Sequence, residues 1–222
     1  TDTNSGDGGH GIYSDGALTI SQSENSKSTT IRTAQGGTST NGTGGSGIYS
    51  CDTLTISQRD NSTSTTIGTT QGGTSTNGTG GNGIYSSGNL FISKSAAITD
   101  ATGGASTDGY AGDGIHSDGK LTISGGTIGT AQGGNGTISG GSGILGNTME
   151  ILAGTIQKAI GGNSTGTGEN DTGGDGISAR EFNISGGKIQ QATGGASTNG
   201  SGGSGIYSST LTISGNATIG NA

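Results

Sequence analysis

The sequence has no tryptophan, no proline, two histidines and one cysteine among 222 residues. A single cysteine excludes a disulfide framework within the chain. Cys51 occupies the position that Asp15 and Asp118 hold in two other copies of a repeat described below. It is interpreted either as a chance substitution at a turn or as a thiol that reacts or forms an intermolecular bridge.

Positive charge is scarce as well. Lys and Arg total 8 against 15 Asp and Glu, which gives a formal charge of −7. Because there is no basic stripe to displace counterions, we expect no nucleic-acid partner and no attraction to an anionic membrane surface. No stretch approaches the ~18 consecutive apolar residues that a spanning helix needs, so we expect no membrane insertion.

Apolar residues make up only 24% of the chain, while 53 residues are glycine. This composition alone is typical of disordered chains. The apolar residues nevertheless fall at fixed phases of a repeat that begins with Gly-Ile. The copies start near residues 11, 47, 83, 114, 143, 176 and 205. One unit cannot bury an apolar face alone, but stacked units can, so we predict a single β-solenoid domain over residues 1–222.

Each copy contains three short segments in which apolar and polar residues alternate, as side chains do across a strand. The first supplies one inward Ile, the second an inward pair such as Leu54 and Ile56, and the third one Ile such as Ile67. Each strand can pair in parallel with its counterpart in the next coil, ~4.8 Å away. The predicted fold class is all-β, a single-stranded parallel β-helix of about seven coils with three short strands per coil, right-handed as parallel crossovers usually are.

The remaining residues of each copy are expected to form corners and loops. Glycine suits the corners because it tolerates positive φ. The residue before each Gly-Ile is polar, as at Asn82, Asp113 and Asp175, and can hydrogen-bond along the stack. Length varies in the insertions SENSKSTT and RDNSTSTT and in the GGTSTNGTGG-type stretch. Such variation maps to loops on one face of a solenoid.

Three strings carry a resemblance to known proteins: GDGIHSDGKLTISGGTI (112–128), GDGISAREFNISGGKI (174–189) and GSGIYSSTLTIS (203–214). They resemble the repeats of clostridial surface carbohydrate-binding β-helix domains, which are related in fold to pectate lyases, and those of adhesin-like surface proteins. The pattern covers nearly the whole chain. The resemblance implies an extracellular location, polysaccharide binding and, in some members, calcium. No defined calcium-ligand string is present, so no ligand is carried over from it.

The residue after the inward Ile of the first segment must point outward, and it varies between copies. Four of these residues are the main candidate site, a platform for the apolar faces of sugars: Tyr13, Tyr49, Tyr85 and His116. Rings ~4.8 Å apart would offer a ladder of flat faces with polar tips. The alternative is that the tyrosines stack on one another and seal a corner of the fold.

A second candidate site is a weak calcium site formed by Glu169, Asp171 and Asp175, because oxygen-rich and glycine-flexible loops suit calcium. The alternative is that these are solvated turn carboxylates, since the spacing of a calcium-binding loop is absent. Asp113 and Asp118 form a second acidic group that flanks His116. No other cofactor is expected.

Catalysis is not expected, because neither histidine pairs with a nucleophile by spacing. Ice binding by ranks of threonine is a further alternative function. The rank before the third inward Ile is the most regular, but Ala97 and Lys188 interrupt it. Its threonines are Thr30, Thr66, Thr127, Thr155 and Thr218.

These observations point to a non-catalytic structural or adhesin-like module, secreted or displayed at a cell surface, that binds polysaccharide or a cell-surface glycan. Neither end of the repeat carries a polar cap, so unpaired strand edges and apolar rungs are expected there. One alternative is a subunit of an extracellular filament, in which the solenoid ends associate head to tail. The other explanation of uncapped ends is that flanking repeats of a longer protein continue the stack.

Overall fold

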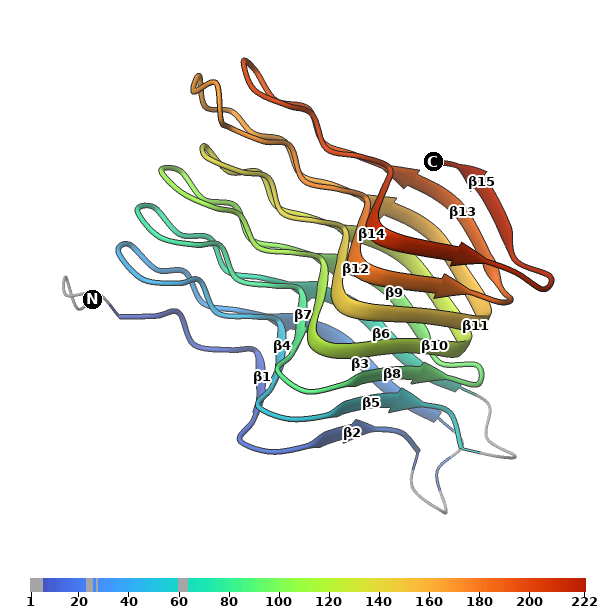
Figure 1. Ribbon diagram of the computed structural model, residues 1–222. Coiled ribbons are helices and arrows are strands. Elements are labelled where there is room, and N and C mark those ends of the chain that lie inside the picture. The colour runs from blue at the N-terminus through green and yellow to red at the C-terminus, as the bar shows by residue number, and fades with distance from the viewer. Residues whose placement is uncertain (1–5, 23–25, 27, 60–63) are drawn as a thin grey trace.

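The computed structural model describes residues 6–22, 26, 28–59 and 64–222, and its fifteen strands belong to one sheet that winds into a β-solenoid (Figure 1). All the strand pairings between named strands are parallel. The predicted fold class is therefore confirmed. None of the described residues belongs to a helix long and apolar enough to cross a membrane.

The Gly-Ile segments stack as one continuous column of strands. In order, the column contains β1 (Ile12–Ser14), β4 (Ile48–Ser50), β7 (Ile84–Ser86), β10 (Ile115–Gln132), β11 (Ile144–Ile160), β12 (Ile177–Ile184) and β14 (Ile206–Ile213). Equivalent residues of the repeat are paired, as Ile48 is with Ile84 and Ile84 with Ile115. The register of the repeat in the sequence is thus the register of the sheet.

The second and third segments stack in the same way. Second-segment strands are β2 (Leu18–Ile20), β5 (Leu54–Ser57) and β8 (Leu90–Ser93). Third-segment strands are β3 (Ser28–Gln35), β6 (Ser64–Gln71), β9 (Ala97–Thr102), β13 (Lys188–Thr193) and β15 (Thr218–Asn221). In β10 and β11 all three segments join into one long strand that bends around the solenoid (Figure 1).

The core is a narrow seam of aliphatic side chains inside these coils. The inward second-segment residues Leu54, Leu90, Leu121 and Met149 are all 0% exposed, and so is Phe182 in the same row. Each fully buried side chain of this size contributes roughly 1.5–3 kcal/mol relative to an exposed one. A chain with few apolar residues can therefore be stable, because most of its Ile and Leu side chains are buried in this seam.

The expected number of coils was slightly high, since the solenoid has about five turns. Five strands of the first column, β4, β7, β10, β11 and β12, pair with a neighbour on both sides, whereas β1 and β14 pair on one side only. The end rungs are correspondingly less buried. Leu211 and Ile213 of β14 are 44% and 53% exposed, and Ile12 and Leu18 are only partly buried.

Several of the polar residues that precede Gly-Ile form the predicted ladder. The Asp113 N–H donates to Asn82 Oδ1 at 2.7 Å, and the Ser142 N–H donates to Asp113 Oδ1 at 2.6 Å. The Ser204 N–H likewise donates to Asp175 Oδ1 at 2.7 Å. Each side chain thus satisfies the backbone donor at the same position of the next coil, which ties the corners of successive coils together.

The GGTSTNGTGG-type stretches do not form irregular loops. Each runs out from the solenoid and returns beside itself, so that the stack forms a long arm (Figure 1). Backbone hydrogen bonds alternate between outgoing and returning segments, as from Gly104 N to Gly81 O (2.7 Å) and from Gly112 N to Gly104 O (2.9 Å). A Cβ added to Gly103 would lie 1.9 Å from Gly112 O, which leaves no space for a side chain between the two layers.

The prediction that glycine serves positive φ at the corners accounts for few of the glycines. Among the described residues, positive φ occurs at Gly126, Gly154, Gly187 and Gly215, together with the non-glycine Lys94. All five lie at the corner before a third segment. Most glycines are instead required by the close approach of backbones in the arm. Half of each of the two insertions that lengthen the first coils lies outside the described residues, at 23–25 and 27 and at 60–63.

The arm provides a matched pair of Gly→Ala substitutions at the same repeat position. We expect Gly174→Ala to lower the free energy of unfolding by about 3 kcal/mol, because its Cβ would lie 1.9 Å from Gly141 O. Gly9→Ala should change it by less than ~0.5 kcal/mol, because nothing lies within 4 Å of its Cβ. Urea unfolding of both variants checks this, and equal effects would contradict the packing argument.

Candidate functional site

The outward residues of the first segments form one column along the solenoid, in register from coil to coil. The column contains Tyr13, Tyr49, Tyr85, His116, Leu145, Ser178 and Tyr207. The structure therefore brings the four predicted platform residues together. It also shows that the column changes character after His116, where the side chains become aliphatic and then small.

The first part of the column is a stack of rings. The ring centroids of Tyr49 and Tyr85 lie 4.8 Å apart with planes 29° apart, and those of Tyr13 and Tyr49 lie 5.7 Å apart. His10 extends the stack, with its ring 4.1 Å from that of Tyr49. Because Tyr49 stacks on His10 and Tyr85, and Tyr85 stacks on Tyr49 and meets His116 at a steep angle, these two rings offer less free face to a sugar than an unstacked ring does. The arrangement matches the alternative in which the tyrosines seal a corner.

Sequence reasoning did not place His10 in this stack. Its signal was available, since His10 is the one aromatic residue among the polar residues that precede Gly-Ile. Its Nδ1 accepts a hydrogen bond from the Ser46 N–H at 2.9 Å. Burial lowers the pKa of His10, with the nearby Asp7 charge opposing this effect. His10 is therefore a neutral ring that supports the corner.

The tyrosine hydroxyls bind acidic neighbours on the outer surface. Tyr85 donates to Asp118 Oδ2, and Tyr13 donates to Asp15 Oδ1 at 3.1 Å. Cys51 Sγ lies 3.4 Å from the Tyr13 hydroxyl. Burial, followed by the bond to Asp118, raises the pKa of Tyr85 far above its ordinary value. The tyrosine hydroxyls thus remain protonated donors at neutral pH.

His116 ends the ring stack and is held between two carboxylates. Its Nδ1 lies 2.9 Å from Asp113 Oδ2, and its Nε2 lies 3.0 Å from Asp118 Oδ1. Its ring meets that of Tyr85 edge to face, with centroids 5.2 Å apart. Burial alone would lower the pKa of His116, but the hydrogen bonds and charges of Asp113 and Asp118 outweigh it and raise the pKa above its ordinary value.

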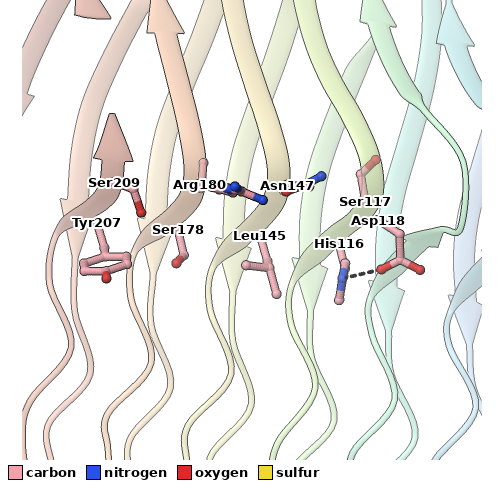
Figure 2. A pocket seen from close by; sticks show the side chains of 11 residues that line it. His116, Ser117, Asp118, Leu145, Asn147, Ser178, Arg180, Tyr207 and Ser209 are labelled. Atoms are coloured by element: carbon pink, nitrogen blue, oxygen red, sulfur yellow. Dashed lines mark ion pairs between the residues drawn. The ribbon is translucent and has the colours of Figure 1, made fainter. Parts of the chain in front are cut away.

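Beyond His116, four successive coils line a groove of about 360 Å³. Figure 2 shows its side chains in two rows that run along the stack. One row consists of residues of the outward column: His116, Leu145, Ser178 and Tyr207. The row beside it contains Asp118, Asn147, Arg180 and Ser209. The small Ser178 and the aliphatic Leu145 form the floor between two ring-bearing ends. Three coil steps separate these ends, about 14 Å.

The groove combines groups that recognise polyhydroxylated ligands. Tyr207 is 55% exposed, so its ring is available to an apolar sugar face. Arg180 is exposed and belongs to none of the ion pairs found among the described residues. Concave sites with an apolar floor and a few convergent polar groups are the usual form of ligand sites.

Sequence reasoning named His116 but missed Tyr207 and Arg180 as members of one site. Tyr207 is the seventh residue of the outward column, and Arg180 stood as an isolated cation in the sequence. The available signal was the interruption of the column by the smaller Leu145 and Ser178. The depth that this interruption creates depends on the side chains of neighbouring coils.

The structure does not bring the predicted calcium ligands together. Among the residues described, no group of three or more His, Cys, Asp or Glu side chains is arranged to hold a metal ion. Asp171 Oδ2 accepts a hydrogen bond from the Gly168 N–H at 2.6 Å, and Asp175 Oδ1 is bonded to the Ser204 N–H. The Asp171 carboxylate thus stabilises its own turn, the Asp175 carboxylate bonds the next coil, and Glu169 is exposed. A calcium site at these residues gains no support from this geometry.

Comparison with known proteins gives no relative on which to base a function: no family model matches the chain, and no curated protein or solved structure matches it significantly. The resemblance to clostridial carbohydrate-binding domains is therefore supported only at the level of the β-helix fold.

The bond between Tyr85 and Asp118 is open to a direct test. Tyr85→Phe keeps the stacked ring but removes the hydroxyl, so we expect the free energy of unfolding to fall by about 1 kcal/mol. Tyr207→Phe is the control, because no hydrogen bond from its hydroxyl is found among the described residues. Thermal or urea unfolding at neutral pH checks both variants, and indistinguishable values would refute this role of Tyr85.

Proposed function

We propose that this protein is a non-catalytic repeat module, secreted or displayed at a cell surface, that binds polysaccharide in the groove between His116 and Tyr207. The observation that carries the proposal is the concave interruption of the aromatic column. Rings stand at both ends of the groove, and a row of polar side chains lies beside its floor. The ligand would lie along the solenoid and extend over about three coil steps.

The side chains of the groove support a saccharide better than an apolar ligand. Asp118, Asn147 and Ser209 can accept or donate hydrogen bonds to hydroxyl groups, and Arg180 can donate several. Tyr207 offers an exposed ring face at the end of the groove. The rings of Tyr49 and Tyr85, in contrast, are stacked against each other outside the groove. The binding surface proposed here is therefore the second half of the column, not the tyrosine ladder.

A binding role is favoured over catalysis by the surroundings of His116. Both of its ring nitrogens are taken up by Asp113 and Asp118, so neither is free to accept a proton from a nucleophile. The thiol of Cys51 contacts the Tyr13 hydroxyl rather than a base. The surface location is supported by the resemblance of the repeats to those of bacterial surface proteins.

Substitution within the groove tests the proposal. The assay measures binding of the purified chain to a panel of immobilised plant, microbial and animal polysaccharides. We expect Tyr207→Ala and Arg180→Ala each to weaken binding about tenfold, because the first removes the exposed ring face and the second a charged hydrogen-bond donor. Tyr110→Ala is the matched control, since Tyr110 lies in the arm and is 54% exposed, as Tyr207 is 55% exposed. Absence of binding to the whole panel, or equal losses with Tyr110→Ala, would refute the groove.

A second candidate function is a filament subunit whose solenoid ends stack head to tail. It is favoured by the last rung, where Leu211 and Ile213 are 44% and 53% exposed, although Phe182 and Ile184 below them are 0% and 1% exposed. Strands of a second copy could pair with β14 and cover these side chains.

Sedimentation velocity and electron microscopy of the 222-residue chain test the filament. We expect association that increases with concentration and that Ile213→Lys abolishes, because a buried charge in the joint is costly. Ile138→Lys is the control, since Ile138 is 37% exposed but lies in the arm. A monodisperse monomer at high concentration would rule out stacking of this chain.

A further inference from the structure

His116 belongs both to the ring stack and to the groove. It is the last ring of the stack, in contact with Tyr85, and the first residue of the outward column that lines the groove. Asp118, which His116 contacts through Nε2, begins the polar row of the same groove. A change in the charge of His116 therefore alters its interaction with Asp118, a side chain that lines the groove.

The contacts of His116 require its charged form. A carboxylate can only accept hydrogen bonds, and a neutral imidazole carries a single N–H donor. Since Nδ1 and Nε2 lie 2.9 Å and 3.0 Å from the oxygens of Asp113 and Asp118, both nitrogens must carry a proton for both bonds to form. Loss of one proton leaves a nitrogen lone pair facing a carboxylate.

The two carboxylates differ in how firmly they are held. Asp113 is 9% exposed and also accepts the Ser142 N–H at 2.6 Å. The side chain of Asp118 is 48% exposed, and its other bond comes from the Tyr85 hydroxyl on the protein surface. When one bond must break, the remaining N–H therefore stays with Asp113, and Asp118 is released from His116 and keeps only its bond from the Tyr85 hydroxyl.

No other described charged group compensates for this change. Lys120 of the same strand is paired with Glu150 Oε2 at 2.6 Å. The neighbouring strand β11 presents Leu145 and Asn147, which do not titrate. Arg180 lies two coils away along the groove. From the preceding coil, β7 presents Tyr85, which stays protonated at neutral pH.

We propose that His116 is a pH-dependent clamp on the polysaccharide groove: protonated, it holds Asp118 in place and the groove binds, and deprotonated, it releases Asp118 and binding weakens. This regulation presupposes that the groove binds polysaccharide, as proposed above. Its physical basis is preorganisation, because a ligand that binds a groove with a loose wall must also order that wall. If the ligand is acidic, loss of the positive charge of His116 next to the Asp118 carboxylate weakens binding as well.

The direction of the pH dependence follows from the geometry and from the raised pKa of His116. Binding is strongest below the ordinary histidine pKa of about 6.5, and it declines as the pH rises through the higher pKa of His116 in the folded protein. We expect affinity to fall about fivefold or more across this transition. By linkage, bound polysaccharide raises the pKa of His116 further.

The experiment has two independent readouts over about pH 5 to 9. NMR of imidazole-labelled protein follows protonation of His116 without any ligand, and His10→Asn removes the second histidine signal. This control reproduces the Asn82 found at the same repeat position, whose Oδ1 accepts the equivalent backbone N–H. Affinity for the best polysaccharide of the panel is then measured over the same range.

The proposal requires that His116 titrate above ~6.5 and that affinity begin to fall at the NMR midpoint of the free protein. Asp118→Asn and His116→Tyr should both remove the pH dependence, whereas His10→Asn should retain it. The tyrosine in His116→Tyr is the residue that Tyr49 and Tyr85 supply at this repeat position.

Titration of His116 at or below ~6.5 overturns the clamp. A raised midpoint with pH-independent binding overturns the regulation but leaves the groove as a binding site. Absence of binding at every pH overturns both proposals, and the NMR midpoint then describes a structural ion pair.

Discussion

Parallel hydrogen bonding between equivalent residues of successive coils is the constraint on which the rest of this structure depends. Every coil repeats the backbone path of the coil before it, so each strand finds its partner at the same residue of the repeat, as Ile48 does with Ile84. In the arm this pairing operates almost without side chains, through bonds such as Gly112 N to Gly104 O. The aliphatic seam needs only to fill the narrow interior, which explains how so few apolar residues suffice.

The same register determines where functional chemistry can arise. A side chain at one repeat position stands directly over its counterpart in the next coil, so identical residues produce a column and a change of residue produces a recess. Tyr49 and Tyr85 stack and cover one another, while Leu145 and Ser178 leave the space that becomes the groove. A regular repeat therefore forms a groove where its outward residues depart from regularity.

Much of the fold could be predicted from particular positions. The constant Ile of the first segment, the inward pairs such as Leu90 and Ile92, and the polar residue before Gly-Ile all take the places that alternation and stacking predict. The arm could not be foreseen in this way, because Gly, Ser and Thr have the composition of a loop. Only contact between two backbone layers shows why Gly103 has no room for a side chain.

The sequence by itself determined the winding of the chain, since periodic Ile and Leu dictate which face is buried and which residues pair. Tertiary structure alone decided the chemistry of the outer surface. Whether a ring is covered or free, as at Tyr85 and Tyr207, depends on the size of its neighbours one coil away. The charge of His116 likewise depends on Asp113 and Asp118 approaching it from two sides. The ring contacts join residues about one repeat apart in the sequence, and alternation along a strand carries no information about them. Asp113 and Asp118 lie next to His116 in the sequence, but only the folded chain shows that each carboxylate meets a different ring nitrogen.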